Sequence, residues 1–142
     1  MAKSSAYSNK LVTAMLDGVR VQGLWEGDDA ISVAPDADIG QMMVGADGSS
    51  IFSQTANASA TITLHLQHTS PTHRNLHQKL ARQRSSVLTG FPFSVVDTAS
   101  GEGGSTDQTF IQTAPTDEKG QNAVVRTWVL ICGSWTPEIP AG

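Results

Sequence analysis

The stretch "TANASATITLHLQHTSPTHRNLHQKL", from Thr55 to Leu80, changes its hydrophobic period part-way along. Up to Gln67 every even-numbered residue is Ala, Ile or Leu, and every odd-numbered residue is polar. Successive side chains of a strand point to opposite faces, so this alternation predicts a strand from Thr55 to Gln67 with one buried face and one polar face. Strands usually span about 5–6 residues. The extra length therefore indicates a structure larger than a small sandwich.

A helix is predicted to follow this strand, over residues 71–84. Ser70 is a candidate N-cap, and Pro71 suits the first helical position, where its missing N–H costs nothing. Leu76 and Leu80 are four residues apart and form a narrow apolar stripe. Basic residues gather near the C-terminal end, where the helix dipole favours cations. We expect a single amphipathic helix.

Two hairpins are predicted before the long strand. In "KLVTAMLDGVRVQGLW", Asp17 and Gly18 separate two apolar-rich runs, and Asp-Gly favours a type I′ turn. We expect paired strands over Leu11–Leu16 and Val19–Trp25. The segment "QMMVGADGSSIF" predicts a second pair of strands around a turn over residues 46–48.

The C-terminal half is predicted to form further strands. "VLTGFPFSVVDT" and "QTFIQTAP" flank the Gly-rich segment "ASGEGGSTD". "NAVVRTWVLICGSW" is apolar at odd and even positions, which is typical of a central strand buried on both sides. The predicted fold class is mainly β, an antiparallel β-sandwich or half-barrel with one flanking α-helix.

The chain of 142 residues and 15.0 kDa is predicted to form a single domain over residues 1–142. A flexible N-terminus is expected over residues 1–6. Extended loops are expected near 26–41, where "AISVA" would be a short strand, and near 99–108. Long connections in compact domains often serve function or assembly.

Charged residues make up 15% of the chain, against about 25% in ordinary soluble domains. A surface poor in charge and rich in neutral polar groups favours a protein that is covered in its working state. The net charge of -4 argues against non-specific binding to nucleic acid. No apolar run suits a secretory signal or a membrane span, and the single cysteine cannot form an internal disulfide. We expect a soluble protein made in the cytoplasm, with no membrane contact.

The histidines are the main candidates for metal chemistry. His73 and His77 are spaced to share a helix face, but Arg74 stands where a zinc motif of the His-Glu type would have Glu. His65 and His68 lie on the preceding strand and loop. We expect hydrogen-bonded or solvated histidines and no metal or cofactor.

Other chemical motifs are incomplete. "DADIG" at residues 36–40 begins like a calcium loop but lacks the closing acid, and "GEGG" at residues 101–104 has no lysine after it. Cys132 lies in an apolar strand, as an inert core thiol would. The three tryptophans, Trp25, Trp128 and Trp135, suit a core or a subunit interface, or else a sugar-binding face. No nucleophile, base and oxyanion donor come together, so we expect no enzyme.

The order of these motifs resembles the tail tube proteins of contractile-tailed bacteriophages. The motifs are the hairpin "YSNKLVTAMLDG", the turn "GADG", the alternating strand that leads into "TSPT" and a helix, and the closing Trp128 followed by "GSWTPEIPAG". The resemblance is most specific from Gly45 to Leu80 and from Trp128 to Gly142. It is weaker at Tyr7 to Gly18, and neither residues 91–122 nor the Asp-rich segment after Trp25 carry a matching pattern. Ring-forming tube proteins of type VI secretion share this architecture.

The resemblance implies a structural virion protein that assembles as hexameric rings stacked into a hollow tube. Its implied partners are further copies of itself, the tail sheath protein, the tape measure protein, the baseplate hub and the tail terminator. DNA would pass through the lumen without specific binding. The protein would be made in the host cytoplasm and would function in the virion.

Site residues follow from combining this resemblance with the residue patterns. The polar face of the long strand is the predicted lumen lining: Asn57, Ser59, Thr61, Thr63 and His65. The two loops are predicted to stack one ring on the next through Asp28, Asp29, Asp36, Gly101 and Gly103. The same polar face would lie on the outside if the protein were a monomeric sandwich.

Two other functional classes remain as alternatives to the structural hypothesis. A monomeric β-sandwich that binds carbohydrate or mediates adhesion would expose its tryptophans to solvent. A metal-dependent enzyme built on the histidines would contain stoichiometric zinc, and removal of the metal would destabilise it.

Overall fold

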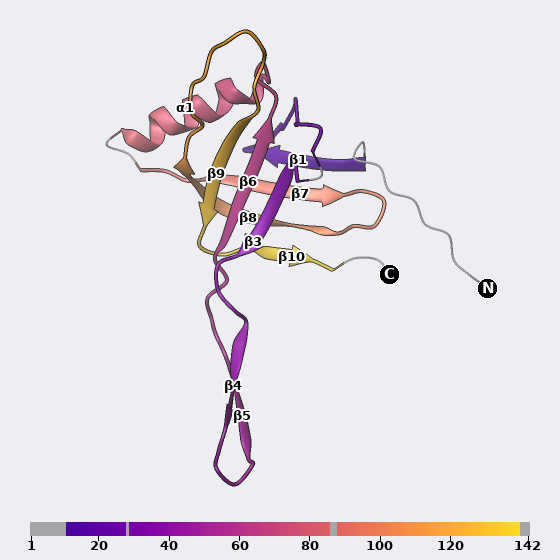
Figure 1. Ribbon diagram of the computed structural model, residues 1–142, viewed down its shortest axis with the longest axis vertical. Helices are drawn as coiled ribbons and strands as arrows, with labels where there is room; N and C mark the ends of the chain where they lie inside the picture. The colour runs from indigo at the N-terminus through magenta and orange to yellow at the C-terminus, as the bar shows by residue number, and fades with distance from the viewer. Residues whose placement is uncertain (1–10, 28, 86–87, 140–142) are drawn as a thin grey trace, which may run out of the picture.

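The computed structural model describes residues 11–27, 29–85 and 88–139. Its antiparallel strands form one large sheet and a separate hairpin, and the described residues include a single helix (Figure 1). The sheet comprises β1 (Val12–Leu16), β2 (Val19–Arg20), β3 (Ile31–Pro35), β6 (Ala60–Leu66), β7 (Phe91–Asp97), β8 (Gly103–Thr113), β9 (Arg126–Cys132) and β10 (Thr136–Glu138). The hairpin is β4 (Gly40–Val44) with β5 (Ser50–Gln54), and the helix is α1 (Thr72–Arg84). The predicted mainly β class with one flanking helix is confirmed.

The large sheet bends at β8. Its strand order is β2-β1-β7-β8-β9-β6-β3, and β10 pairs with β8 beside that path. Residues 103–105 of β8 pair with β10, whereas residues 109–113 pair with β9. The two ends of β8 thus belong to two sheet halves, and Figure 1 shows β1 and β7 running across β6 and β9. The resulting half-barrel encloses the core.

The alternation of β6 supplies the centre of this core. Ala60, Ile62, Leu64 and Leu66 are buried, and the intervening side chains are half-buried. Trp128 lies opposite Leu64 on β9 and is fully buried. Burying a large apolar side chain contributes about 1.5–3 kcal/mol. The even-numbered face of β6 therefore accounts for much of what holds the fold together.

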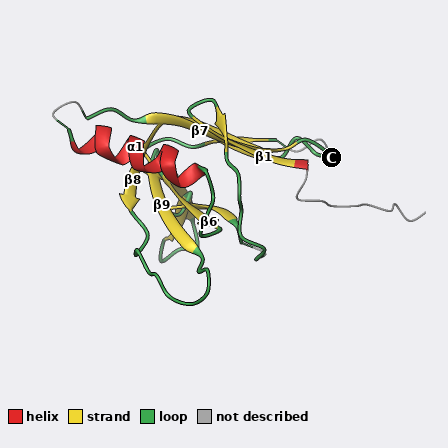
Figure 2. Ribbon diagram, turned by 90° about the horizontal axis from the view of Figure 1, so that it is seen from above, coloured by secondary structure: helices red, strands yellow, loops and turns green. Residues whose placement is uncertain are grey.

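Helix α1 lies beside β8 and β9 (Figure 2). It begins at Thr72, one residue after the predicted start, so Pro71 is the N-cap and the prediction of Ser70 for that position is wrong. Ser70 still holds the helix entry, because its Oγ accepts the N–H of Thr72 over 3.2 Å. Leu76 is fully buried and Leu80 packs against the core, so the predicted apolar stripe is confirmed. In the part of the chain that the structure describes, no helix is long and apolar enough to cross a membrane.

The predicted hairpins form, but both strands of the first one are shorter than predicted, since β1 begins at Val12 and not at Leu11. Asp17 (φ 52°) and Gly18 (φ 80°) both have positive φ, as a type I′ turn requires. β2 ends at Arg20, so the predicted strand Val19–Trp25 is too long. The chain leaves the ladder there because Gln22 turns to the helix entry, where its N–H donates to Thr72 Oγ1 over 2.8 Å. The hairpin of β4 and β5 is confirmed, as is the short strand β3.

The predicted strand from Thr55 to Gln67 is wrong in its first five residues. Side chains there bond to the backbone two residues on: the N–H of Asn57 donates to Thr55 Oγ1 (3.1 Å), and the N–H of Ser59 donates to Asn57 Oδ1 (3.0 Å). Such local bonds compete with a strand ladder. The segment in which alanines alternate with polar residues is therefore irregular in conformation, and β6 begins at Ala60.

Two further expectations need correction. Residues 103–108, predicted within the extended loop near 99–108, open β8 instead, because residues 103–105 pair with β7 on one side and β10 on the other. β9 is fully buried on the face of Trp128 and Leu130, whereas Val129 and Ile131 on its other face are half-buried. The predicted burial on both sides is thus incomplete in a single subunit.

Because Gly104 has no side chain, the ring of Trp135 can lie close to the backbone of β8 where this strand bends. A Cβ at this position would lie 2.6 Å from the indole ring of Trp135, which packs against the core. We expect Gly104→Ala to lower the free energy of unfolding by about 1–3 kcal/mol through overpacking, measured by urea denaturation. Gly133→Ala is the control, because a Cβ there meets nothing within 4 Å. Equal stability of the two variants would contradict the argument.

Candidate assembly surfaces

The odd-numbered side chains of β6 form one wall of the bent sheet. Thr61, Thr63 and His65 are half-buried and point away from the core. Across the ladder they lie opposite Ile131, Val129 and Thr127 of β9. His65 Nδ1 and Thr127 Oγ1 are 2.9 Å apart, a hydrogen bond that ties the two strands together on this face. The wall thus mixes hydroxyl groups, one imidazole and two aliphatic side chains.

Carboxylates stand at both ends of this wall. Asp29 Oδ2 lies 3.6 Å from His65 Nε2, and Thr61 Oγ1 donates to Asp36 Oδ1 over 2.5 Å. The structure therefore brings together two sets of residues that the sequence assigned separately, the lumen lining and the stacking loops. No lysine or arginine occurs among the β6 and β9 side chains that form this wall.

The other predicted site residues lie elsewhere. Asn57 and Ser59 belong to the irregular segment before β6, where Ser59 Oγ donates to Asn57 Oδ1 over 2.7 Å. Gly101 has φ 76° in the turn between β7 and β8, and Gly103 is the first residue of β8. Asp28 lies outside the described residues. The roles of all ten residues in assembly stay predictions.

The most exposed apolar surface is the hairpin of β4 and β5, which we call the arm. It projects from the body (Figure 1), and each of its strands pairs only with the other. Five large apolar side chains on it are more than half exposed: Met42, Met43, Val44, Ile51 and Phe52. The sequence predicted the hairpin but not its detachment. The run Met42 to Val44 was the available signal, because it breaks the alternation of a strand with one wet face.

An apolar pocket of about 580 Å³ lies at the root of the arm. Its walls come from β3, the irregular segment before β6, β7 and the C-terminal end of the sheet. Val33, Val95 and Trp135 provide large apolar side chains, and Ala56 and Ala58 add small ones. Glu102 adds one carboxylate to this mainly apolar lining, so the hollow suits an apolar side chain better than an anion.

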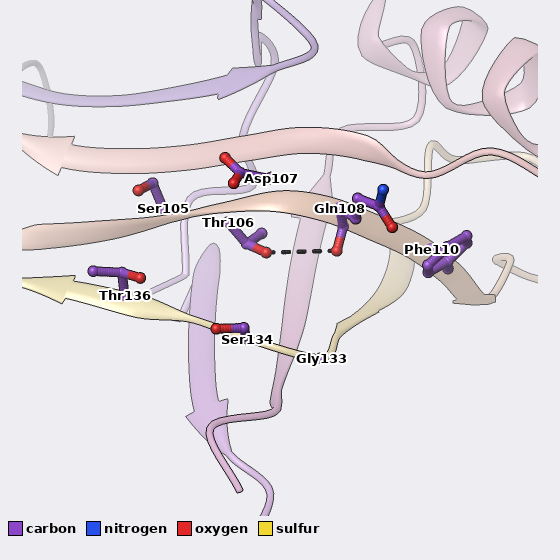
Figure 3. Close-up of a pocket in the computed structure, with 8 residues that line it drawn as sticks. All are labelled: Ser105, Thr106, Asp107, Gln108, Phe110, Gly133, Ser134 and Thr136. Atoms are coloured by element: carbon purple, nitrogen blue, oxygen red, sulfur yellow. Dashed lines mark hydrogen bonds between the residues drawn. The ribbon is translucent and has the colours of Figure 1, made fainter. Parts of the chain in front are cut away.

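A second pocket, of about 490 Å³, lies where β8 passes from β10 to β9 (Figure 3). Its lining is mostly Ser, Thr and Gly together with Gln108 and Phe110, and Asp107 is its only ionisable residue. Thr106 Oγ1 donates to the carbonyl of Gln108 over 3.5 Å across the bend. The carboxylate of Asp107 therefore stands in this pocket among hydroxyl and amide groups, with no second ionisable lining residue beside it.

His73 joins the helix to the sheet. The indole N–H of Trp128 donates to His73 Nδ1 over 3.0 Å, so His73 Nε2 carries the proton and donates to the carbonyl of Gln67 over 2.8 Å. The ring is neutral in this arrangement. Burial lowers the pKa of His73, and the nearby positive charge of Arg126 adds to that effect, whereas the bond to Gln67 opposes it.

The remaining histidines have separate partners. His77 contacts the edge of Trp128, with ring centroids 4.9 Å apart. His68 Nδ1 accepts the N–H of Val124 over 3.3 Å. Within residues 11–27, 29–85 and 88–139, no three His, Cys, Asp or Glu residues gather as a metal site would require. Cys132 is buried in the core, as predicted.

A family model described as "Bacteriophage PhiTE tail tube protein" matches residues 4–137. The chain belongs to this tail tube family. The resemblance found in the sequence motifs is thereby confirmed. Membership makes the chain a tail structural protein and favours a structural role over an enzymatic one. No curated protein sequence matches the chain.

Solved structures share the fold of this tail tube family member at low sequence identity. The sheath/tube terminator of the extracellular contractile injection system PVC matches with a TM-score of 0.64 and 12% identity, over 97% of this chain and 100% of the other. The tube terminating cap of the anti-feeding prophage matches with a TM-score of 0.65 and 13% identity, over 96% and 93%. A chain of the PVC sheath-tube complex matches with a TM-score of 0.58 and 11% identity, over 94% and 98%.

We expect the stability of this tail tube protein to fall in acid because of His73. Its pKa in the folded state is lowered from the ordinary value of 6.5, so the unfolded chain binds more protons between the two values. The contribution of neutral His73 to the stability of the folded state is fully present above pH 6.5. It is lost as the pH falls from 6.5 towards the lowered pKa. Urea denaturation at about pH 7.5 and about pH 5 should show this loss.

His73→Gln is expected to reduce this difference between the two pH values, whatever it does to stability at neutral pH. His77→Gln is the control on the same helix and should keep most of the difference, because burial lowers the pKa of His73 more than the charge of His77 does. A pH dependence that survives unchanged in His73→Gln would show that the effect comes from other groups.

Proposed function

We propose that the chain assembles as hexameric rings that stack into the inner tube of a contractile phage tail, the conduit for DNA during ejection. The observation that carries this proposal is the match of the tail tube family model to residues 4–137. The likeness to chains from contractile systems, among them a sheath/tube terminator and a tube terminating cap, supports the contractile setting. A protein that works by assembly needs no catalytic group.

The open sheet supports closure between subunits. β3 ends the strand order on one side and β2 ends it on the other, and β10 is a further edge along β8. Unpaired strand edges tend to recruit other chains, and a closed barrel removes them. A ring in which the edge of one copy meets an edge of the next would satisfy the exposed backbone groups of β3.

In such a ring we assign the wall of Thr61, Thr63 and His65 to the lumen, with Asn57 and Ser59 continuing it. Threonine hydroxyls and aliphatic neighbours give a surface without the cations that grip phosphate. Asp29 and Asp36 at the ends of the wall add negative charge, which repels DNA. The lumen would therefore let DNA pass without holding it.

The remaining partners follow from the same setting. The tail sheath would contact the outside of the tube, the tape measure protein would fill the lumen before DNA, and the baseplate hub and tail terminator would meet the two tube ends. Contacts between rings would involve Asp28, Asp29, Asp36, Gly101 and Gly103. The subunit would be synthesised in the host cytoplasm and would reside in the virion.

Negative-stain electron microscopy of the purified protein over a concentration series tests assembly directly. We expect six-fold rings or hollow tubes, because the open edges and the arm remain unsatisfied in a monomer. Light scattering on the same samples should rise with concentration. A monomer that persists even after tube ends are added as seeds would overturn the proposal and favour the carbohydrate-binding alternative.

The lumen assignment has a separate test in accessibility to thiol reagents. Thr63→Cys in assembled tubes should react with a small maleimide but be protected from one carrying a large polymer, which is excluded from the bore. Gln78→Cys, on an exposed position of α1, should react with both. Cys132 is buried and should contribute little background. Equal labelling of Thr63→Cys by both reagents would place this wall outside the tube.

A further inference from the structure

We propose that Met42 and Met43 form an oxidation site, at which hydrogen peroxide or a similar two-electron oxidant prevents the subunit from joining a tube. At each residue the thioether sulfur takes one oxygen atom from the peroxide, which is thereby reduced to water, and a sulfoxide results. The loss of assembly rests on the proposed function, whereas the selectivity of the oxidation depends on the subunit alone. Four observations lead to this inference.

The first observation is the exposure of the side chains that contain sulfur. Among the described residues these are Met15, Met42, Met43 and Cys132. Met42 is 59% exposed and Met43 is 70% exposed, whereas Met15 is half-buried in β1. Cys132 is 1% exposed, and its thiol donates to the carbonyl of Ala60 over 3.6 Å. An oxidant in solution therefore reaches the two methionines of the arm first.

The second observation is that the core does not depend on methionine. In the part of the chain that the structure describes, the buried apolar residues are Ala, Val, Leu, Ile, Phe, Trp and the single Cys. β4 and β5 pair only with each other, so a sulfoxide in the arm leaves the packing of β6 against Trp128 unchanged. Oxidation of the arm would thus alter the surface of the subunit without unfolding its body.

The third observation is that the two methionines lie on opposite faces of the arm. In the register of the hairpin Met43 pairs with Ile51, and Met42 pairs with Phe52. Neighbouring positions of a strand point to opposite sides, so each face carries one methionine across from one other apolar residue. Oxidation of both methionines would therefore place a polar sulfoxide oxygen on each face.

The fourth observation is that the arm has no charge along its strands. Neither β4 nor β5 contains an ionisable residue. Of its five exposed large apolar side chains, the two methionines are the ones that peroxide converts, since Val44, Ile51 and Phe52 contain no sulfur. A mild oxidant can therefore make a large part of this apolar surface polar without adding a charge.

A sulfoxide in the arm opposes its burial. Exposed apolar surface of this kind marks a site of protein contact, and in the proposed tube the arm would be covered. A sulfoxide oxygen is a hydrogen-bond acceptor, and its burial without a donor is unfavourable. We expect oxidation of both methionines to raise the protein concentration needed for tube formation by at least about tenfold.

Peroxide treatment of the purified, unassembled chain tests the inference. Peptide mapping by mass spectrometry should find sulfoxide at Met42 and Met43 at least about threefold sooner than at Met15. Sedimentation and electron microscopy should then show the loss of tubes, while the thermal midpoint of the subunit stays the same. A mixture of the two methionine sulfoxide reductases, one for each sulfoxide epimer, should restore assembly.

The double variant Met42→Leu with Met43→Leu keeps apolar side chains of similar volume but removes both thioethers of the arm. It should form tubes like the unmodified chain, and it should still form them after peroxide treatment. Met15→Leu is the matched control, because it removes the half-buried thioether of β1 and leaves the arm unchanged. It should lose assembly after peroxide treatment as the unmodified chain does.

Each outcome decides the inference. Equal oxidation rates at Met15 and in the arm would contradict the selectivity. Normal tubes from the oxidised chain, or a loss of tubes in the peroxide-treated double variant, would show that arm oxidation does not control assembly. If the untreated chain forms no tubes, the proposed function fails and the consequence for assembly fails with it. The untreated sample identifies that case, since the oxidation rates are measured independently of assembly.

Discussion

The packing of the even-numbered face of β6 against Trp128 is the interaction on which the rest of the structure depends. It buries one side of the sheet half formed by β3, β6 and β9. The same tryptophan donates its indole proton to His73 and contacts His77, so it also fixes the helix over the sheet. With one face committed to the core, the opposite face of β6 is left as a wall of hydroxyl and aliphatic groups.

The elements with a local signal could be predicted from sequence. The Asp17-Gly18 turn and the alternation from Ala60 to Leu66 each depend on a few adjacent residues, and each forms as expected. The helix entry lies one residue later than predicted, because Pro71 is the N-cap in place of Ser70. The strand prediction was wrong where a short-range sequence pattern is compatible with two backbone conformations. Asn57 and Ser59 fit an alternating strand on paper, but their side chains bond locally to the backbone and stop the ladder.

Features that depend on contacts between residues far apart in the chain could not be predicted from the sequence. Gly103 and Gly104 resemble a loop until β10 and Trp135 are placed beside them, and only then is the need for glycine evident. The meeting of His65 with Asp29 likewise depends on how β3 pairs with β6. The tail tube resemblance nevertheless came from motif order alone, because a family can keep short motifs while its loops diverge.

The detachment of the arm has a consequence for the timing of assembly. A subunit whose core is complete without the arm can fold and remain dispersed while its hairpin finds no surface to lie against. If further copies cover the arm in the proposed tube, the first ring must form without a prepared surface, whereas every later ring finds one ready. Growth from an existing end is then much faster than spontaneous initiation. Tube formation would show a lag that a preformed end removes, so the place and moment of initiation would be set by whatever supplies that end.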